Sequence, residues 1–289
     1  MTDTGYTLAS LLARRLPRRA ADVLAESFSD FYVLTHPGRA RAVDSNLAWI
    51  WAQAEREGPA PRARATYRTF ARAVRDFLAH DGARAGEAPR VLLAEGAEEA
   101  LARARASGRG TVIVSGHFGP WERALQWLAS ELGGVDALAA PHRFPAVERF
   151  FVRRRAAFGV RTLCDTRPVQ TALQNLRSGG WIAALADRPR RPATLQSEAG
   201  NAIVSLDCGP LVLARRARAQ VLPGVSRFTA DGGYEVRLEQ PFSLDPGSDG
   251  ITLAQARDRL QQFFDEHVRA YPTQWFAWGQ ERPARSAVP

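Results

Sequence analysis

A histidine and a glutamate mark the point where an apolar run gives way to a helical pattern, in the stretch GTVIVSGHFGPWERALQWL (residues 110–128). Four residues separate His117 from Glu122, and across a tight turn this spacing can fold the carboxylate back onto the imidazole. A carboxylate on one ring nitrogen fixes the tautomer and makes the other nitrogen a better base. The pair therefore predicts a general base with its orienting group and no protein nucleophile. The alternative is a histidine that only caps or packs the turn.

The residues around the pair indicate how it is positioned. Residues 111–116 are short, apolar and β-branched, which is typical of a buried strand. Gly119 permits a tight turn, and Pro120 suits the first position of a helix. Glu122 then falls in the first helical turn, where the helix dipole favours a negative charge. Strand position, glycines and spaced carboxylate together favour the catalytic interpretation.

The rest of the chain indicates a sheet wrapped by helices. Further strands are predicted at 135–140, 160–164 and 181–186, with helices between them, and an antiparallel hairpin at 221–228 and 234–240. Sites in such sheets lie outside the carboxyl ends of the strands, and both His117 and Asp187 directly follow a predicted strand. We predict one α/β domain over residues 1–289, with a helical N-terminal subregion (1–85) and an α/β catalytic core (90–289).

The N-terminal region combines leucines at helical spacing with arginines. The leucines are Leu8, Leu11, Leu12 and Leu16, and the interleaved arginines are Arg14, Arg15, Arg18 and Arg19. The segment is either an amphipathic helix packed on its own domain or an interfacial helix whose arginines meet anionic lipid.

The formal net charge is +9, and all 39 basic residues are arginine. A GC-rich genome explains arginine in place of lysine; the alternative is attraction to an anionic partner such as lipid headgroups, phosphorylated substrates, an acidic carrier protein or nucleic acid. The lack of lysine excludes a Schiff-base or P-loop lysine. Aromatic residues are not interleaved with the arginines, so we predict no nucleic-acid partner.

Two isolated cysteines and the absence of a long apolar run bear on location. Cys164 and Cys208 form neither a CxxC pair nor a zinc spacing, which fits a reducing compartment, and we expect both to be small buried hydrophobes. No apolar run approaches the roughly 18 residues of a membrane span. The sequence therefore predicts a cytoplasmic protein that lies against a membrane surface.

The motif HFGPWE resembles the H-x4-E signature of the bacterial lysophospholipid acyltransferase-like family, which includes the late lipid A biosynthesis acyltransferases and the phosphatidylinositol mannoside acyltransferases of actinobacteria. Other segments resemble the family in the same order along nearly the whole chain: FVRRRAAFGV, LRSGGWIAALADRP, GPLVLARRARAQVLPGV and YPTQWFAWGQERP. Pro120 departs from the pattern, since the family usually has asparagine there.

The resemblance implies a mixed sheet flanked by helices, as in glycerol-3-phosphate acyltransferases. It implies transfer of a fatty acyl chain from an acyl thioester, on acyl carrier protein or coenzyme A, to a hydroxyl of a lipid or glycolipid. His117 would be the general base and Glu122 its orienting group. The acceptor hydroxyl would attack the thioester directly, in agreement with the lack of a GxSxG motif.

Four more residues receive roles through the resemblance. Arg155 would stabilise the oxyanion or hold a donor phosphate, Arg143 would bind phosphate, and Asp187 and Arg188 would line the acceptor side. The alternatives are a solvated helix face for Arg155 and an ion pair at the strand end for Asp187 and Arg188. We expect no metal or cofactor besides the acyl co-substrate.

The resemblance also implies a peripheral location on the cytoplasmic face of the inner membrane. Three alternative functions remain open at this point: a thioesterase that uses water with the same dyad, an N-acyltransferase, and a basic non-enzymatic module that binds membrane or nucleic acid.

Overall fold

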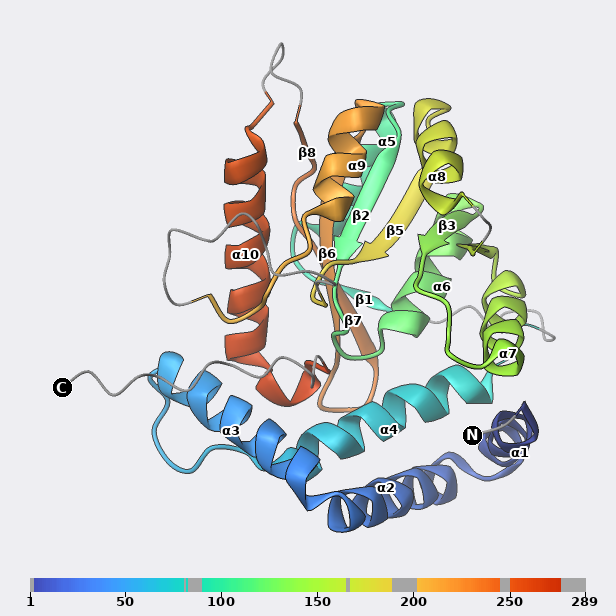
Figure 1. The fold of residues 1–289 in the computed structure, drawn as a ribbon, viewed down its shortest axis with the longest axis vertical. Coiled ribbons are helices and arrows are strands. Elements are labelled where there is room, and N and C mark those ends of the chain that lie inside the picture. Colours follow the sequence, from blue (N-terminus) through green and yellow to red (C-terminus); the bar gives the residue numbers. More distant parts are fainter. Residues whose placement is uncertain are drawn as a thin grey trace.

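The computed structural model describes residues 3–80, 82, 90–164, 167–188, 202–244 and 250–276. In this part of the chain a mixed sheet of eight strands has the order β1-β7-β6-β2-β5-β3-β4, with β8 paired to β6 (Figure 1). The strands are β1 (Leu92–Leu93), β2 (Thr111–Ser115), β3 (Val135–Leu138), β4 (Val160–Leu163), β5 (Trp181–Leu185), β6 (Gln220–Phe228), β7 (Tyr234–Leu238) and β8 (Phe242–Ser243). The expected α/β fold, a mixed sheet flanked by helices, is confirmed.

The centre of the sheet is parallel. Strand β2 pairs in parallel with both β5 and β6, and Ser115 lies opposite Leu185 at the carboxyl ends of β2 and β5. The predicted hairpin is confirmed as the antiparallel pair β6–β7. Because β2 and β5 are neighbours and end at the same level, the residues that follow them meet at one edge of the sheet.

Helices cover both faces of the sheet. On one face α8 (Pro168–Arg177), α9 (Gly209–Ala217) and α10 (Leu253–Ala270) pack on Val112 and Val114 of β2. On the other, α5 (Ala97–Ala106) and α6 (Trp121–Leu132) pack on Ile113. Alternate residues of a strand point to opposite faces, which explains why the middle of β2, Val112–Val114, is apolar on both faces. Helix α5 was not predicted from the sequence.

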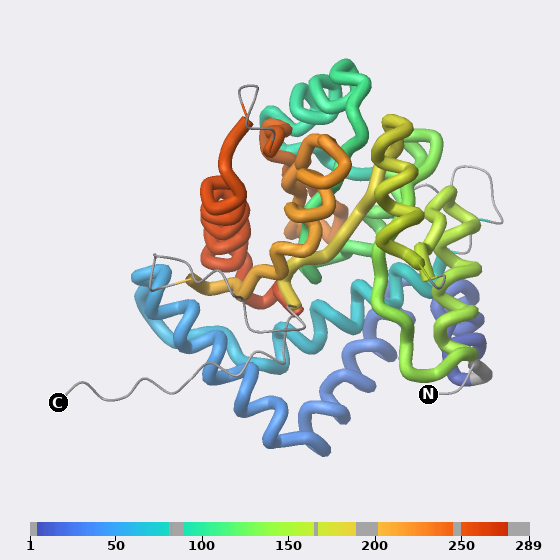
Figure 2. Tube along the Cα trace, turned by 45° about the horizontal axis from the view of Figure 1, so that its top comes forward, coloured from blue at the N-terminus to red at the C-terminus, as the bar shows by residue number. Residues whose placement is uncertain are grey.

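Four N-terminal helices lie across one end of the sheet (Figures 1 and 2). They are α1 (Asp3–Arg15), α2 (Arg18–Thr35), α3 (Pro37–Gln53) and α4 (Ala63–Ala79), and they confirm the expected helical N-terminal region. Phe70 and Ala73 of α4 pack in one cluster with Trp121 at the start of α6 and with Phe276. The strands' carboxyl ends therefore face a helical layer.

The structure contradicts the expectation for the two cysteines. Cys164 is exposed and Cys208 half-buried, so the prediction that both are buried is wrong. Cys164 directly follows β4, which is an edge strand. Most of residues 80–90 and 187–202, and the end of the YPTQWFAWGQERP motif, lie outside the described residues. Among the described helices, none has both the length and the apolar character needed to cross a membrane.

Candidate active site

The loop between β2 and α6 is held in a tight conformation. Gly119 has a φ of 50°, and a Cβ there would lie 2.7 Å from the Cα of Arg227. Phe118 is fully buried, and its carbonyl accepts a hydrogen bond of 2.8 Å from the Ser226 hydroxyl. The loop is thus packed against β6, and the backbone of His117 is fixed as a result.

Asp187 holds the imidazole of His117. Its Oδ1 lies 2.8 Å from His117 Nδ1, and its Oδ2 accepts the backbone N–H of His117 at 3.0 Å. The indole N–H of Trp275 also donates to Oδ2, at 3.0 Å. Asp187 is 0% exposed; burial would raise its pKa, but the hydrogen bonds and charge of His117 outweigh burial and lower the pKa. An ionised carboxylate therefore fixes the proton on Nδ1 and leaves Nε2 as the basic nitrogen.

The second ring nitrogen of His117 is available. Nε2 forms no hydrogen bond with any residue the structure describes, and the side chain is 20% exposed. The ring of Trp121 lies 5.6 Å away, centroid to centroid, and covers one side of the imidazole. An incoming hydroxyl can reach this nitrogen.

Glu122 does not contact the imidazole, which corrects the predicted His117–Glu122 dyad. Its two oxygens accept hydrogen bonds from Arg155 Nε (3.0 Å) and Nη2 (2.5 Å). Glu122 points from the first turn of α6 toward the last turn of α7 (Pro145–Ala156), which carries Arg155. The orienting carboxylate comes instead from the end of β5.

Arg155 is buried, so the alternative that it lies on a solvated helix face is wrong. Burial opposes its charge, but the charge and hydrogen bonds of Glu122 outweigh burial and raise the pKa of Arg155. Its Nη1 is buried and has no hydrogen-bond partner among the described residues, so this nitrogen of a fixed cation is unsatisfied there, beside the cavity described below.

The other predicted site residues are placed separately. Asp187 is fully buried and cannot line the acceptor side as predicted; it holds His117 instead. Arg188 donates from Nη2 to the carbonyl of Phe276 at 2.5 Å. Arg143 is exposed beyond the end of β3, with its guanidinium 5.6 Å from the ring of Phe144.

An apolar cavity lies between the sheet and α6. Apolar side chains from β2, β3, β5, β7 and α6 line it, together with Glu122 and Arg155. Trp121 lines the cavity and also neighbours the His117 ring. Trp121 therefore separates the cavity from the imidazole of His117, and the apolar lining of the cavity suits a hydrocarbon chain.

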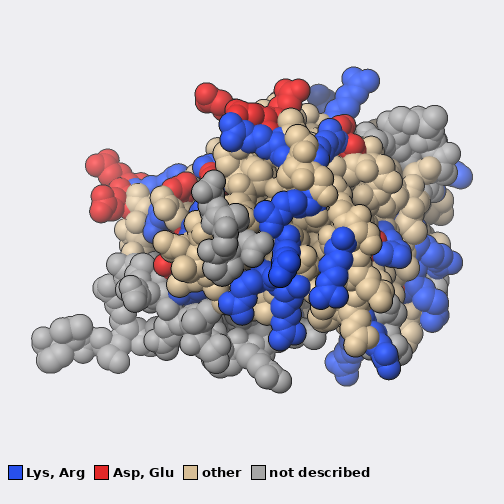
Figure 3. Space-filling model, turned by 90° about the horizontal axis from the view of Figure 1, so that it is seen from above, with Lys and Arg blue, Asp and Glu red and all other residues tan. Residues whose placement is uncertain are grey.

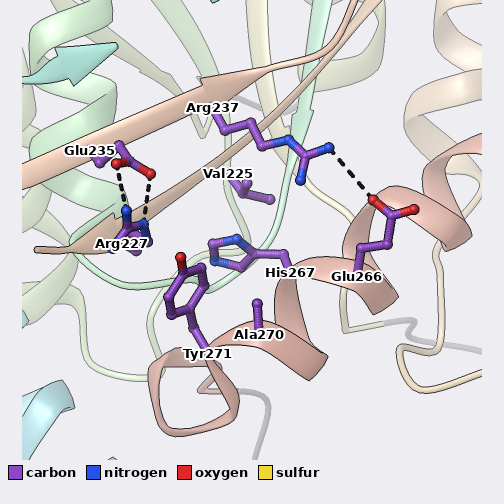
Figure 4. Close-up of a pocket in the computed structure, with 8 residues that line it drawn as sticks. All are labelled: Val225, Arg227, Glu235, Arg237, Glu266, His267, Ala270 and Tyr271. Atoms are coloured by element: carbon purple, nitrogen blue, oxygen red, sulfur yellow. Dashed lines mark hydrogen bonds and ion pairs between the residues drawn. The ribbon is translucent and has the colours of Figure 1, made fainter. Parts of the chain in front are cut away.

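A second cavity, of about 150 Å³, lies between α10 and the β6–β7 hairpin (Figure 4). His267 lies between the ion pairs Arg227–Glu235 and Arg237–Glu266. Burial, reinforced by the charges of the two arginines, lowers the pKa of His267 to about 3. This histidine is neutral, and the proposed chemistry does not involve it. No group of three potential metal ligands of the His, Cys, Asp and Glu types occurs in the described part of the chain.

Sequence reasoning missed two features of the site. The position of Asp187 after a strand was visible, but its pairing with His117 follows from β5 lying beside β2, which periodicity does not reveal. Apart from the motif in which Trp275 lies, nothing in the sequence indicated that this residue contacts the site.

Comparisons with known proteins show what the chain is similar to. The sequence model of the family described as bacterial lipid A biosynthesis acyltransferase matches residues 5–282. The chain is 26% identical over 284 residues to a phosphatidylinositol mannoside acyltransferase of Mycolicibacterium smegmatis, covering 95% of this chain and 89% of that one. It is 23% identical over 287 residues to the protein of the same name from Mycobacterium tuberculosis (strain CDC 1551 / Oshkosh), covering 95% and 86%. The solved 1-acyl-sn-glycerophosphate acyltransferase PlsC of Thermotoga maritima aligns with a TM-score of 0.40 and 13% identity, over 88% of this chain and 98% of that one.

Proposed function

The chain belongs to the bacterial lipid A biosynthesis acyltransferase family and is an acyltransferase, and we propose that it moves a fatty acyl chain from an acyl thioester to a hydroxyl of a lipid or glycolipid. The observation that carries the proposal is the contact of 2.8 Å between Asp187 and His117 Nδ1, which leaves Nε2 as an open base.

The proposed reaction needs no covalent enzyme intermediate. His117 Nε2 takes the proton of the acceptor hydroxyl while the oxygen of that hydroxyl attacks the carbonyl carbon of the thioester. The tetrahedral intermediate collapses, the C–S bond breaks, and the leaving thiolate takes the proton from the imidazolium. Asp187 stabilises the imidazolium throughout, because its carboxylate remains hydrogen-bonded to Nδ1–H.

Arg155 is our candidate for stabilising the developing oxyanion. It is a buried cation with an unsatisfied donor beside the cavity, and such a preorganised charge has a large effect where water is excluded. Glu122 then has a different role from the one first expected: it compensates and orients Arg155.

The apolar cavity is proposed to hold the acyl chain, with acyl carrier protein or coenzyme A as the donor. The two mycobacterial relatives are named for a phosphatidylinositol mannoside, and a phosphoglycolipid of that kind is the acceptor we propose here. Arg143 and Arg188 would lie on the polar side of such an acceptor.

Membrane attachment is proposed through the exposed apolar side chains of α1 and α2. Phe28, Phe31 and Leu34 of α2 are 65%, 64% and 78% exposed and follow one another at a spacing of three residues. Leu8 and Leu11 of α1 are exposed as well, and arginines at 14, 15, 18 and 19 lie between the two stripes. Apolar side chains beside arginines suit an anionic membrane surface. We propose the cytoplasmic face of the inner membrane.

Acyl transfer is tested with purified protein, radiolabelled acyl thioester and lipid acceptor. His117→Ala should abolish ester formation, and Asp187→Asn should reduce kcat by roughly 10²–10⁴-fold. His36→Ala, at an exposed histidine of α2's end, is the control and should retain full turnover. Full turnover of His117→Ala would exclude the proposal, release of free fatty acid alone would identify a thioesterase, and an amide product would identify N-acylation.

A further inference from the structure

A second histidine of this chain is also held by a carboxylate at its backbone N–H and its Nδ1. Oε2 of Glu148 makes both contacts: it accepts the backbone N–H of His142 at 2.7 Å and lies 2.6 Å from His142 Nδ1, whereas Asp187 uses one oxygen for each contact with His117. The corresponding distances from Asp187 to His117 are 3.0 and 2.8 Å. In both residues a carboxylate fixes the ring, and Nε2 forms no hydrogen bond with a described residue. Such an arrangement prepares Nε2 for a group from outside.

His142 lies on the same edge of the sheet as His117. It follows β3, and β3 is separated from β2 only by β5. At about 4.8 Å between neighbouring strands, the ends of β2 and β3 are about 10 Å apart.

Packing connects His142 with the wall of the acyl cavity. Its ring stacks on Phe151 at 4.5 Å, and the guanidinium of Arg155 lies 5.7 Å from the same phenyl ring. Arg155 lines the cavity, and so does Ala139, three residues before His142. His142 therefore lies beside the cavity rather than across the molecule from it.

The charges at this position favour an anion. Burial would raise the pKa of Glu148, but the hydrogen bonds of His142 and the charges of His142 and Arg155 outweigh it and lower the pKa. The negative charge of Glu148 is thus engaged by groups already present. Arg143, the next residue along the chain, is exposed and forms no ion pair with a described residue, and the His142 side chain is 33% exposed. With Nδ1–H donated to Glu148, Nε2 donates a hydrogen bond only when the ring also carries a proton there. Such an imidazolium N–H, with an arginine as the next residue, is a donor set for phosphate.

We propose that His142, together with Arg143, binds a phosphate group of the acyl donor or of the lipid acceptor beside the acyl cavity. The inference rests on the proposed acyl transfer, in which the polar part of each substrate lies outside the apolar cavity. Nothing in the transfer step itself requires His142, so its role is binding rather than proton transfer.

Two substitutions of His142 separate binding from a local structural role. His142→Asn retains an amide N–H in place of Nδ1–H for Glu148 but removes the donor at the position of Nε2. His142→Gln places its amide near the position of Nε2 and gives up the bond to Glu148. Calorimetry on the full chain, with no turnover, compares coenzyme A with pantetheine, which lacks phosphate. A second pair of probes is phosphatidylinositol and diacylglycerol in micelles of a non-ionic detergent.

If the donor supplies the phosphate, His142→Asn should weaken coenzyme A binding about 10- to 100-fold and leave pantetheine binding unchanged. If the acceptor supplies it, the same variant should weaken binding to phosphatidylinositol micelles only, and in either case His142→Gln should retain more affinity than His142→Asn. Unchanged binding of all four probes by His142→Asn would overturn the inference. Because these measurements involve no catalysis, absence of acyl transfer would count against the proposed function alone.

Discussion

At the scale of single residues, the site depends on which carboxylate pairs with which basic side chain. Asp187 receives two hydrogen bonds from His117 and one from Trp275, while Glu122 neutralises Arg155. Two buried carboxylates thus hold two different side chains, and this division assigns separate roles to substitutions that the H-x4-E spacing alone would treat alike.

Trp275→Phe tests the positioning of Asp187. Loss of the indole N–H leaves one carboxylate oxygen with one hydrogen bond fewer, which should lower kcat about tenfold at unchanged KM and destabilise the fold by about 1–3 kcal/mol. The pKa of Asp187 is depressed in the fold, so its contribution to stability is present above the unfolded pKa near 4 and is lost as pH falls. The variant should lose part of this contribution, as urea titrations at several pH values would measure.

Trp51→Phe is the matched control for Trp275→Phe. It removes an indole N–H that donates to the exposed carbonyl of Gly58 at 3.1 Å. Equal effects of the two substitutions on kcat would contradict a specific role of Trp275.

Glu122→Gln should destabilise the fold more than it would if the role of Glu122 were to orient His117. It leaves the buried Arg155 without its counter-charge, a loss of about 3–5 kcal/mol in the free energy of unfolding. Glu99→Gln breaks the exposed pair with Arg103 and should cost less than about 1 kcal/mol. Chemical denaturation measures both, and a loss of activity in Glu122→Gln with unchanged stability would favour a direct catalytic role.

At the scale of elements, the C-terminal segment 274–276 completes the loop that carries His117. Gly119 N–H donates to the Gln274 carbonyl at 2.7 Å, and Phe276 N–H donates to the His117 carbonyl at 3.0 Å. Phe118 and Trp275 form an isolated antiparallel bridge. A segment more than 150 residues away along the sequence therefore acts as a short partner strand for the loop that carries His117.

Gly119→Ala tests how narrowly this loop is fixed. A Cβ would meet backbone atoms of Ser226 and Arg227 at 2.7 Å, in addition to the strain of a positive φ, so we expect the loop to shift and activity to fall at least tenfold. Gly133 also has a positive φ, but a Cβ there would lie in open space. Gly133→Ala should therefore lower the free energy of unfolding by only about 1 kcal/mol and retain full activity. Comparable activities of the two variants would show that the close approach does not matter.

Most of the strands were predictable from the sequence, and those that were missed were missed for a physical reason. Strands β2 to β7 are short, apolar or alternating runs between turn residues, so periodicity finds them. The edge strands β1 and β8 have two residues each, too few for any pattern. The spacing from His117 to Glu122 correctly placed both residues at a strand-to-helix turn. It failed on their contact, because the partner of a side chain at a strand end is decided by the order of strands in the sheet.

At the scale of the whole molecule, the positive charge is divided between two ends. Arg177 ends α8, and Arg215, Arg216 and Arg218 lie in the last turn of α9 or just beyond it; all four are exposed. Figure 3 shows basic side chains gathered on the face of the molecule that is seen from above. Cations at helix C-termini are favoured by the helix dipole, which explains this group without a partner. The other basic group lies with α1 and α2 at the opposite end, where the strands finish and the active site lies (Figure 1).

The buried His267 makes the stability of the whole fold depend on pH. Its pKa is about 3 in the fold against 6.5 when unfolded, so the unfolded chain binds a proton first and stability falls as pH drops below 6.5. A shift of this size corresponds to a loss of about 2 kcal/mol between pH 7 and pH 5. His267→Gln should flatten the pH dependence by this amount in urea titrations; an unchanged slope would mean that the side chain is not buried neutral.

The proposed membrane surface predicts a change in binding that leaves the chemistry intact. Phe28→Ser combined with Phe31→Ser removes two exposed rings from α2, and at about 2 kcal/mol for each buried ring the affinity for anionic vesicles should fall at least 100-fold. Val169→Ser changes an exposed apolar residue of α8 and should leave vesicle binding unchanged. Raising the salt concentration should weaken binding of the wild type further, because it screens the arginines around the apolar stripe. Vesicle sedimentation measures all three, and transfer to a short-chain soluble acceptor should stay the same in both variants. Retained sedimentation of the double variant would place the membrane contact elsewhere on the protein.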